Sequence, residues 1–390
     1  MRIVLISPLP PARDGIADYT ARLAAAYRSA GHDVAAVTAS PQPDAAFAPV
    51  LGSLTWSPVG LLRLARAVRR WRPDAVQVQH GIATYGPRLL PLWALVMVCR
   101  VAGVRLVLTH HEVTRDVDRL GLPARLYYRF VSNLAAVVHV HTDKARDVLV
   151  DVLHVPASRV LVMPHPVYDS PASDVSGDEL RRRHDVADRT LLLLFGFVHV
   201  EKGLRELVEG LAVLVRRDPS VADRVRLVVA GDVRPRPAAF GRFEQADRDY
   251  LDDVRARVEA HGLGDVVALT GHVPDGEVSG WFEAADVAVL PYTHSEQSGV
   301  ANLAIAAGVP VLASSTGGLG ELFARDLPTF AALDPESVAD GLARFLDAAP
   351  DAGVVARCYA ELTDASSPAR LAELLSQRLG VGVERTGAAA

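Results

Sequence analysis

The sequence predicts an α/β protein of two domains, and three observations support this expectation. The chain has 390 residues, more than one hydrophobic core usually takes. Short apolar runs alternate with amphipathic stretches at helical spacing, the order of a parallel sheet covered by helices. Residues 169–178, rich in Asp, Ser, Pro and Gly, separate two such series and predict an interdomain linker. We therefore expect domains at residues 1–170 and 171–365, followed by a C-terminal segment at residues 366–390.

Composition and charge narrow the classes of protein. Half of the residues are hydrophobic and 22% are charged, the balance of an ordinary globular protein. The net charge of −5 gives no electrostatic reason to expect nucleic acid as a partner. Cys99 and Cys358 lie far apart, without Cys or His at metal-ligand spacing, so reduced cytoplasmic thiols are expected. The uncharged run at residues 89–99 is shorter than the ~18–20 residues needed to cross a bilayer.

Individual elements follow from periodicity and from residues that end helices and strands. Gly31 predicts the end of the first helix, and Thr142 is a suitable N-cap for a later one. The basic segment at residues 233–249 predicts a mobile surface loop. Strands are expected at residues 2–7, 32–38, 75–79, 105–109, 135–141, 159–164, 190–195, 225–231, 266–269, 287–291 and 310–313. Helices are expected at residues 16–30, 61–71, 89–101, 143–150, 203–216, 277–285, 300–307, 337–348 and 368–379.

The helix expected at residues 61–71 is basic and amphipathic. One side carries apolar residues, and Arg63, Arg66, Arg69 and Arg70 occupy the rest of its circumference. Such a helix can pack on a sheet with its arginines in water, which is the interpretation we favour. It can also rest on an anionic membrane surface, so peripheral membrane contact stays open as an alternative.

The stretch at residues 285–321 carries the strongest functional pattern of the chain. It reads as strand, glycine-bearing loop, helix, strand and Gly-Gly turn. Ser298 and Gly299 stand where the helix begins, and free N–H groups and the helix dipole there favour a phosphate. Glu296 and Gln297 stand just before them, where they can hold sugar hydroxyls. An ordinary strand–helix–strand connection would show the same outline.

These residues resemble the donor-binding core of retaining GT-B glycosyltransferases, the large family four, also called group 1. That family reads E-G-F-G-L-x-x-x-E-A-x-A-x-G-x-P-V-V-A-S, then G-G and an acidic residue. Residues 296–300 (E-Q-S-G-V) and 306–314 (A-A-G-V-P-V-L-A-S) match this pattern, followed by Gly317, Gly318 and Glu321. The S-x-Q-S-G-V form marks a variant, because the family's second Glu, which usually holds the ribose, is replaced. Alignment places either Leu303 or Ala304 there.

The resemblance extends to both halves of the chain and implies the GT-B fold, two Rossmann-like domains that face a central cleft. The first domain would bind the acceptor and the second the nucleotide sugar, and the last helix would cross back to the first domain before a disordered tail. Gly15 matches the glycine of the first loop, which approaches the donor phosphate. His111, in T-H-H-E-V, matches the histidine that contacts the transferred sugar.

Further site residues are implied for the second domain. In G-F-V-H-V-E-K-G, Lys202 matches the lysine that neutralises the donor diphosphate, and His199 stands where the family has arginine. Gln297, Ser298, Gly299 and Val300 would bind the diphosphate and sugar. Gly271, His272 and Val273, in T-G-H-V-P, would contact the nucleobase, together with Glu321 for base or ribose. His111, Lys202 and Glu296 are the residues expected to act directly in catalysis.

The implied reaction is transfer of a sugar from a UDP- or GDP-sugar to an acceptor hydroxyl with retention, in glycan or natural-product glycoside biosynthesis. No cofactor is expected, because the nucleotide sugar is a substrate. We expect metal independence, since no Asp-x-Asp motif stands in a suitable loop and His110 and His111, adjacent on a strand, point in opposite directions. The expected acceptor is a small molecule, a lipid-linked molecule or a glycan. Alternatives are a pseudo-glycosyltransferase, a nucleotide-sugar epimerase, or a non-catalytic nucleotide-sugar-binding protein.

Overall fold

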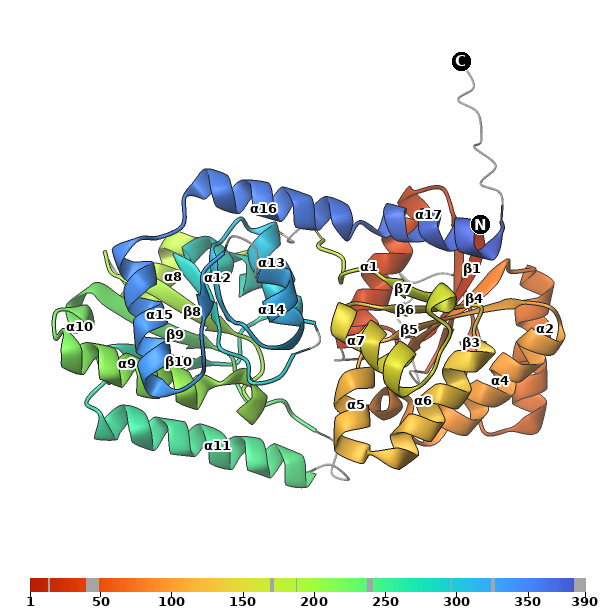
Figure 1. Ribbon diagram of the computed structural model, residues 1–390, viewed down its shortest axis with the longest axis horizontal. Helices are drawn as coiled ribbons and strands as arrows, with labels where there is room; N and C mark the ends of the chain where they lie inside the picture. The colour runs from red at the N-terminus through yellow and green to blue at the C-terminus, as the bar shows by residue number, and fades with distance from the viewer. Residues whose placement is uncertain are drawn as a thin grey trace, which may run out of the picture. The chain divides into compact units, whose positions relative to one another are not determined.

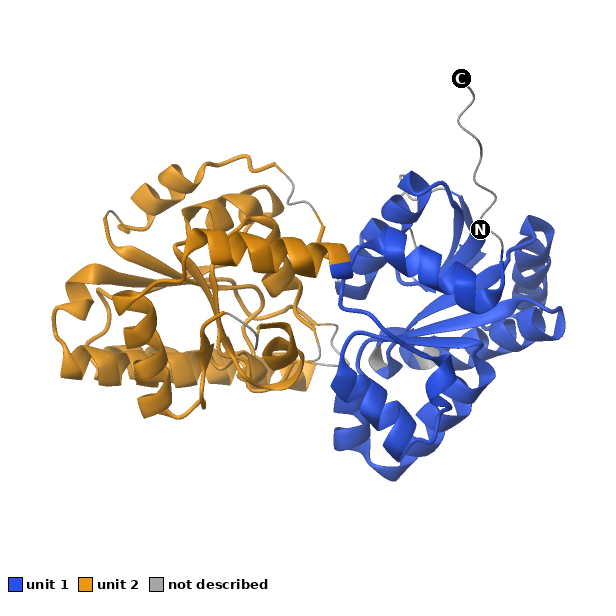
Figure 2. Ribbon diagram, turned by 45° about the horizontal axis from the view of Figure 1, so that its top comes forward, with its two compact units in different colours: residues 1–166, 365–390 blue, residues 167–364 orange. Residues whose placement is uncertain are grey.

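The computed structural model describes residues 1–12, 15–39, 49–168, 172–186, 188–236, 241–295, 297–323 and 327–381. The chain forms two compact units (Figure 2). Unit 1 comprises Met1–Pro166 and Ala365–Ala390, and unit 2 comprises Val167–Asp364. The expected disordered tail from residue 382 onward, and residues 169–171 of the expected linker, lie outside the described residues. No helix within the described ranges is long and apolar enough to cross a membrane.

Unit 1 contains a sheet of seven parallel strands in the order β3-β2-β1-β4-β5-β6-β7 (Figure 1). The order reverses between β1 and β4, which marks a topological switch point of an open α/β sheet. The central strands are buried along nearly their whole length, although β4 and β5 also carry polar residues such as Gln77 and Thr109. The strands are β1 (Arg2–Ser7), β2 (Asp33–Thr38), β3 (Val50–Ser53), β4 (Ala75–His80), β5 (Arg105–His110), β6 (Val137–Val140) and β7 (Val160–Val162).

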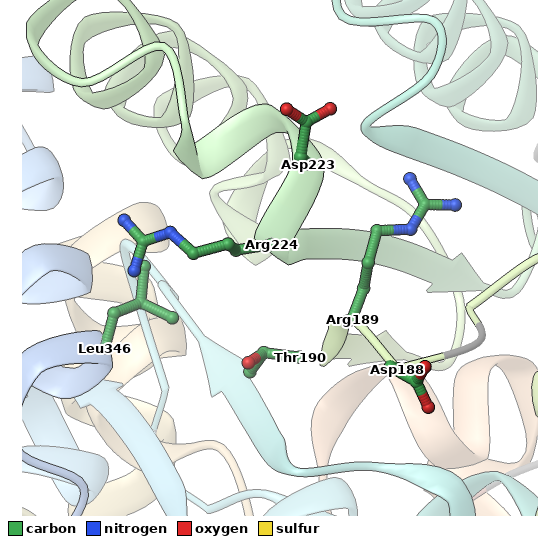
Figure 3. A pocket seen from close by; sticks show the side chains of 6 residues that line it. All are labelled: Asp188, Arg189, Thr190, Asp223, Arg224 and Leu346. Atoms are coloured by element: carbon green, nitrogen blue, oxygen red, sulfur yellow. The ribbon is translucent and has the colours of Figure 1, made fainter.

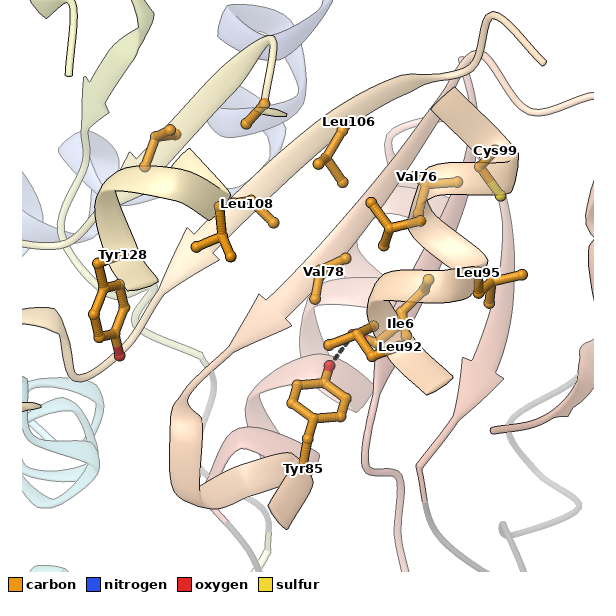
Figure 4. Packing of buried hydrophobic residues seen from close by; sticks show 14 of the residues in the cluster. Ile6, Val76, Val78, Tyr85, Leu92, Leu95, Cys99, Leu106, Leu108 and Tyr128 are labelled. Atoms are coloured by element: carbon orange, nitrogen blue, oxygen red, sulfur yellow. Dashed lines mark hydrogen bonds between the residues drawn. The ribbon is translucent and has the colours of Figure 1, made fainter. Parts of the chain in front are cut away.

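Helices cover both faces of this sheet. On one face, α2, α4, α5 and α6 enclose one hydrophobic core, and Figure 4 shows its centre between α4 and strands β4 and β5. On the other face, α1 and α17 close a second core. The helices are α1 (Gly15–Ser29), α2 (Pro58–Trp71), α3 (Ile82–Tyr85), α4 (Leu89–Val101), α5 (Val113–Leu120), α6 (Leu122–Leu134), α7 (Asp143–Asp147) and α17 (Pro368–Leu379).

Unit 2 contains a sheet of six parallel strands in the order β10-β9-β8-β11-β12-β13, which reverses between β8 and β11. The strands are β8 (Thr190–Phe195), β9 (Val225–Ala230), β10 (Val267–Gly271), β11 (Val287–Leu290), β12 (Val311–Ser314) and β13 (Thr329–Phe330). The helices are α8 (Gly177–Arg183), α9 (Leu204–Arg217), α10 (Val221–Arg224), α11 (Gly241–Ala260), α12 (Val278–Ala284), α13 (Gly299–Ala306), α14 (Gly317–Phe323), α15 (Pro335–Asp347) and α16 (Ala352–Ala365).

The prediction of a loop at residues 233–249 is wrong for the second part of this segment, because α11 begins at Gly241. Its first two turns are dominated by charged residues, and the buried apolar residues become frequent only from Tyr250 onward. A helix that contacts the core along part of its length lacks a full apolar stripe, so its periodicity is weak. Ion pairs between i and i+4 residues, such as Glu244 with Arg248, support the exposed part instead.

Helix α9 approaches α15 closely at Gly210. A Cβ atom on Gly210 would lie 2.3 Å from Cγ1 of Val338, whose side chain is fully buried. The Val338 side chain cannot turn away from such a Cβ atom, because the core that surrounds it is closely packed.

We therefore expect Gly210→Ala to destabilise the protein by roughly 1–3 kcal/mol, the usual effect of overpacking. This is expected even though alanine is more favourable than glycine in a helix by about 1 kcal/mol. Urea unfolding followed by circular dichroism measures this. The control is Gly15→Ala at the start of α1, where a Cβ atom would meet nothing within 4 Å. A stabilising effect of Gly210→Ala would contradict the packing of α9 on α15.

Candidate functional site

The switch point of unit 2 places two loops side by side at the carboxyl ends of β8 and β11. Ligands of open α/β sheets bind in the crevice at such a point, because the connections after the two strands run toward opposite edges of the sheet. Residues 196–203 follow β8, and residues 291–298 follow β11. Four of the residues expected to bind the diphosphate, His199, Lys202, Gln297 and Ser298, therefore lie on the two loops that border this crevice.

Gly203 fixes how closely these loops approach. It adopts the left-handed conformation with φ of +66°, and a Cβ atom there would lie 1.8 Å from the carbonyl oxygen of Pro291. Only glycine allows this approach without displacing the backbone. The loop after β8 is thus held against the first residue after β11, with Lys202 immediately before the contact.

Lys202 lies directly on Tyr292. Its Nζ donates a 2.5 Å hydrogen bond to the Tyr292 hydroxyl and lies 3.9 Å from the ring centroid, a cation–π distance. The Tyr292 side chain is buried, and its carbonyl accepts hydrogen bonds from Ser314 Oγ at 2.7 Å and Thr316 Oγ1 at 2.8 Å. Tyr292 is therefore a rigid support that restricts where the lysine ammonium can lie.

The loop after β11 leads into α13, whose first turn borders the same crevice. Ser298 caps this helix, since its Oγ accepts a 3.1 Å hydrogen bond from Ala301 N–H. The N–H groups of Gly299 and Val300 belong to the first turn, where a helix supplies no acceptor, and they carry the positive end of its dipole. A Cβ on Gly196 would lie 3.4 Å from Val300 Cγ2, so the loop after β8 is adjacent.

A third loop, after β12, supports the crevice. Gly318 N–H donates a 2.7 Å hydrogen bond to the carbonyl of Ser295. Gly317 has φ of +57°, and a Cβ atom there would lie 2.3 Å from the same carbonyl oxygen. The Gly-Gly turn therefore holds the loop after β11 from the side opposite Gly203.

The predicted donor residues divide by position. His199 lies in extended backbone just before the turn that contains Lys202, whose N–H donates to the His199 carbonyl at 2.9 Å. Gln297 is half-buried beside Ser295, which hydrogen bonds to its carbonyl at 3.0 Å. Glu296 lies outside the described residues. No motif in the sequence pointed to Tyr292, although its position directly after a buried strand was a usable signal.

The residues predicted to contact the nucleobase and ribose lie at or after the carboxyl ends of β10 and β12, not of the switch-point strands β8 and β11. Gly271 ends β10 with φ of +75°, His272 is exposed, and Val273 packs partly against the core. Glu321 is exposed on α14, which follows β12. In the strand order, β10 and β12 are separated by β9, β8 and β11, so the strand ends themselves do not bring Glu321 to the Gly271 loop.

In unit 1, His111 follows β5 and is buried at the carboxyl edge of the sheet. Its Nε2 lies 2.9 Å from Oε1 of Gln79, the penultimate residue of β4. Its ring contacts the edge of Tyr19, with centroids 5.0 Å apart, and lies beside His141 at 5.1 Å. His111 is thus held by α1, β4 and the residue after β6.

The same edge carries hydrogen-bonding atoms that the sequence did not single out. Nδ1 of His141 donates to the Met163 carbonyl at 3.2 Å, which leaves its Nε2 as an acceptor. This Nε2 and the amide nitrogen of Gln79 are buried without a hydrogen-bond partner among the described residues. Buried polar atoms of this kind call for a ligand or an ordered water. Together they present one acceptor and one donor, both uncharged.

Six histidines in this region are neutral at pH 7. Burial lowers the pKa of His80 to about 3 and the pKa values of His139 and His165 to about 4. Burial, together with neighbouring histidines, lowers the pKa values of His110, His111 and His141 well below the ordinary value. His111 can therefore offer a neutral hydrogen bond, but it adds no positive charge. Within the described part of the chain, no three His, Cys, Asp or Glu side chains are arranged to hold a metal ion.

Gly15 is the first residue of α1. A Cβ atom there would meet nothing within 4 Å, and its φ is not in the left-handed region. The structure thus supplies no steric reason for glycine at this position. Its proposed contact with the donor phosphate stays a prediction.

A surface hollow of about 610 Å³ lies in unit 2 but away from these loops (Figure 3). Two residues of its wall mark its position: Arg189 directly precedes β8, and Thr190 is the first residue of β8. The hollow is therefore at the amino edge of the sheet. Ligands of open α/β sheets bind at the opposite edge. Arg189 and Arg224 are also engaged, with the Asp265 carbonyl and the Asp218 carboxylate respectively.

Two family models match the chain, one in each unit. Residues 13–170 match the model "Glycosyltransferase Family 4", and residues 189–348 match "Glycosyl transferases group 1". Together they account for most of the chain, and each unit has the Rossmann-like parallel sheet of the GT-B class. The chain belongs to the group 1, family 4 glycosyltransferases, and it is a transferase of that kind.

Individual relatives agree with this assignment. The chain is 27% identical over 313 residues to alpha-D-kanosaminyltransferase of Streptomyces kanamyceticus, covering 76% of this chain and 73% of the relative. It is 30% identical over 289 residues to 2-deoxystreptamine N-acetyl-D-glucosaminyltransferase of Streptomyces fradiae, covering 70% and 62%. Among solved structures, Anabaena HepE in complex with UDP and glucose has a TM-score of 0.71 at 17% identity, covering 98% of this chain and all of that one.

The neutral histidines predict acid sensitivity. The pKa of His139 is about 4 when folded and ~6.5 when unfolded, so the unfolded chain binds more protons as the pH falls below 6.5. Stability is therefore full above pH 6.5 and is lost as the pH falls toward 4, by about 2 kcal/mol for His139 alone between pH 7 and 5. Urea unfolding at both pH values measures the loss. His139→Gln should reduce it by that amount; an unchanged pH dependence would contradict the neutral assignment.

Proposed function

We propose that this glycosyltransferase moves a sugar from a nucleoside-diphosphate sugar to an acceptor hydroxyl with retention of configuration. The observation that carries the proposal is the position of Lys202 on Tyr292, beside the first turn of α13 at the switch point of unit 2. A lysine ammonium and helix N–H groups at one crevice suit a diphosphate, the leaving group of such donors.

The proposed chemistry needs no protein nucleophile. The bond between the sugar's anomeric carbon and the diphosphate breaks, and a bond to the acceptor oxygen forms on the same face. The acceptor proton passes to an oxygen of the leaving diphosphate. Lys202 and the N–H groups of Gly299 and Val300 stabilise the negative charge that develops there. Bound this way, the diphosphate needs no divalent cation, and we propose metal independence.

The acceptor and sugar contacts are proposed for unit 1. His111 would hydrogen bond to the transferred sugar, and its lowered pKa keeps the imidazole neutral for that role. A hydroxyl group both donates and accepts, which matches the Gln79 amide and the His141 Nε2 at the same edge. The named relatives are a kanosaminyltransferase and an N-acetyl-D-glucosaminyltransferase of 2-deoxystreptamine, and the HepE structure holds UDP and glucose. We therefore favour UDP and a small-molecule or glycan acceptor.

The experiment that tests this proposal is a thermal-shift panel with UDP, GDP, ADP, dTDP and their sugar conjugates, each with and without a chelator. A ligand at 100 times its dissociation constant stabilises the folded protein by about 2.7 kcal/mol. We expect a shift with one nucleotide that the chelator does not change. No shift with any nucleotide would contradict donor binding. A shift that disappears with the chelator would contradict metal independence.

Binding without turnover would favour a non-catalytic nucleotide-sugar-binding protein. One observation supports considering it: Leu303 and Ala304, which replace the family's ribose-binding Glu, are apolar, and Ala304 is fully buried in the core. Product analysis separates the enzymatic alternatives. A new glycoside indicates transfer, a pseudo-glycoside indicates a pseudo-glycosyltransferase, and an altered nucleotide sugar without acceptor indicates an epimerase.

We expect Lys202→Ala to lower kcat by on the order of 10²-fold or more, because the leaving group loses its cation. Tyr292→Phe keeps the ring below the ammonium and should have a smaller effect. Arg216→Ala, which removes an exposed positive charge from α9, is the control and should leave kcat unchanged. Near-wild-type turnover of Lys202→Ala would remove the lysine from the mechanism.

Glu296 remains a predicted catalytic residue. Glu296→Gln removes its charge and should weaken donor use while the fold is retained. Steady-state kinetics with varied donor concentration measures this effect. Unchanged kinetics would show that Glu296 is only a loop residue, without a role in donor use.

A further inference from the structure

Helix α4 of unit 1 is apolar on both of its faces. Its inward residues, including Leu92, Leu95 and Val96, belong to the core. Its outward residues are also apolar and stand in water, with Val101 exposed by 85% and Leu90 by 68%; Met97 and Val98 complete the outward set. A helix that is hydrophobic all round is normally covered on all sides. No described residue covers the outer side of α4.

Helices α2 and α6 continue this surface on either side of α4. On α6, Leu122, Leu126 and Phe130 recur every four residues and are each exposed by 60% or more. On α2, Val59 and Leu62 are exposed by 59% and 49%. These three outward faces form what we call the outer helical surface.

The three helices form one continuous layer. Helix α2 packs against α4. Helix α4 contacts α6, because the indole N–H of Trp93 donates a 3.0 Å hydrogen bond to the Tyr127 hydroxyl. All three helices cover the same face of the unit 1 sheet, opposite α1 and α17 (Figure 1). The exposed apolar side chains therefore lie on one side of the unit.

The charge of this surface has one sign. Helices α2, α4 and α6 contain seven arginines and no Asp or Glu, in a chain whose net charge is −5. The arginines are Arg63, Arg66, Arg69, Arg70, Arg100, Arg125 and Arg129. All seven are exposed, and none forms an ion pair with another described residue. The surface thus pairs exposed apolar side chains with unneutralised positive charge.

We propose that the outer helical surface docks on an anionic lipid bilayer. Apolar side chains at the membrane boundary and arginines at the level of the headgroups are the two requirements for interfacial binding, and both occur here. Charge complementarity argues against a second copy of the chain, because two such surfaces would place arginines against arginines. The proposal concerns unit 1 alone and does not depend on the donor site of unit 2.

Vesicle co-sedimentation of the full chain tests the proposal. Vesicles of phosphatidylcholine alone are compared with vesicles that contain about one part in three of phosphatidylglycerol. We expect binding to the anionic vesicles and little to the neutral ones. Raising the salt from 0.1 to 1 M shortens the screening length from about 10 to 3 Å and should weaken the binding.

Two kinds of variant locate the contact. Arg66→Glu should weaken binding at least about fivefold, the effect of roughly 1 kcal/mol per charge. The double variant Leu126→Ser with Phe130→Ser should lower it further by removing apolar contact. Matched controls in unit 2 are Arg216→Glu and Phe243→Ser, an exposed arginine and an exposed phenylalanine on helices. Circular dichroism and thermal midpoints check that each variant is folded.

The outcomes separate the possible occupants of the surface. Loss of binding in the α2 and α6 variants, but not in the controls, supports docking on the bilayer. Absence of binding to either vesicle overturns it, as does binding that these variants leave unchanged. Sedimentation equilibrium tests self-association of the chain. If the protein is a dimer that the double variant Leu126→Ser with Phe130→Ser dissociates, and if it binds no vesicles, the surface is a self-association interface and the proposal is overturned.

Discussion

The close approach of Gly203 to the Pro291 carbonyl is the constraint on which the proposed donor site of unit 2 depends. It joins the loops that follow β8 and β11, the two strands between which the sheet order reverses. Lys202 then has Tyr292 beneath it, and the first turn of α13 opens beside it. Close packing of the backbone thus brings the loop that carries Lys202 to the first turn of α13.

Much of this arrangement was accessible from the sequence. The apolar run that Pro291 ends, and Ser298 and Gly299 at a helix start, predicted a phosphate-binding turn, and the structure contains the cap. Lys202 was assigned by resemblance alone, since a lysine after a strand is common on any surface. Its support by Tyr292 could not be predicted, because that contact joins residues 90 positions apart and depends on the strand order.

The proposed acceptor site of unit 1 shows a different limit of sequence reasoning. His111 was singled out, but Gln79 and His141 were not, although all three meet at one sheet edge. Their common position follows from the parallel pairing of β4, β5 and β6, which a list of single strands does not contain. The neutral state of these histidines follows from their burial. The three side chains that meet there are polar and uncharged, whereas Lys202 brings a positive charge to the loops of unit 2.

Isothermal titration calorimetry on wild-type protein and Lys202→Ala tests the central claim most directly, with a nucleoside diphosphate and the same nucleoside without phosphates as ligands. If Lys202 holds the diphosphate, the variant loses about 1.5–3 kcal/mol of binding free energy for the diphosphate and none for the nucleoside. Equal weakening of both ligands would mean that the substitution disturbs the unit as a whole. Unchanged binding of both would place the diphosphate elsewhere and contradict the account.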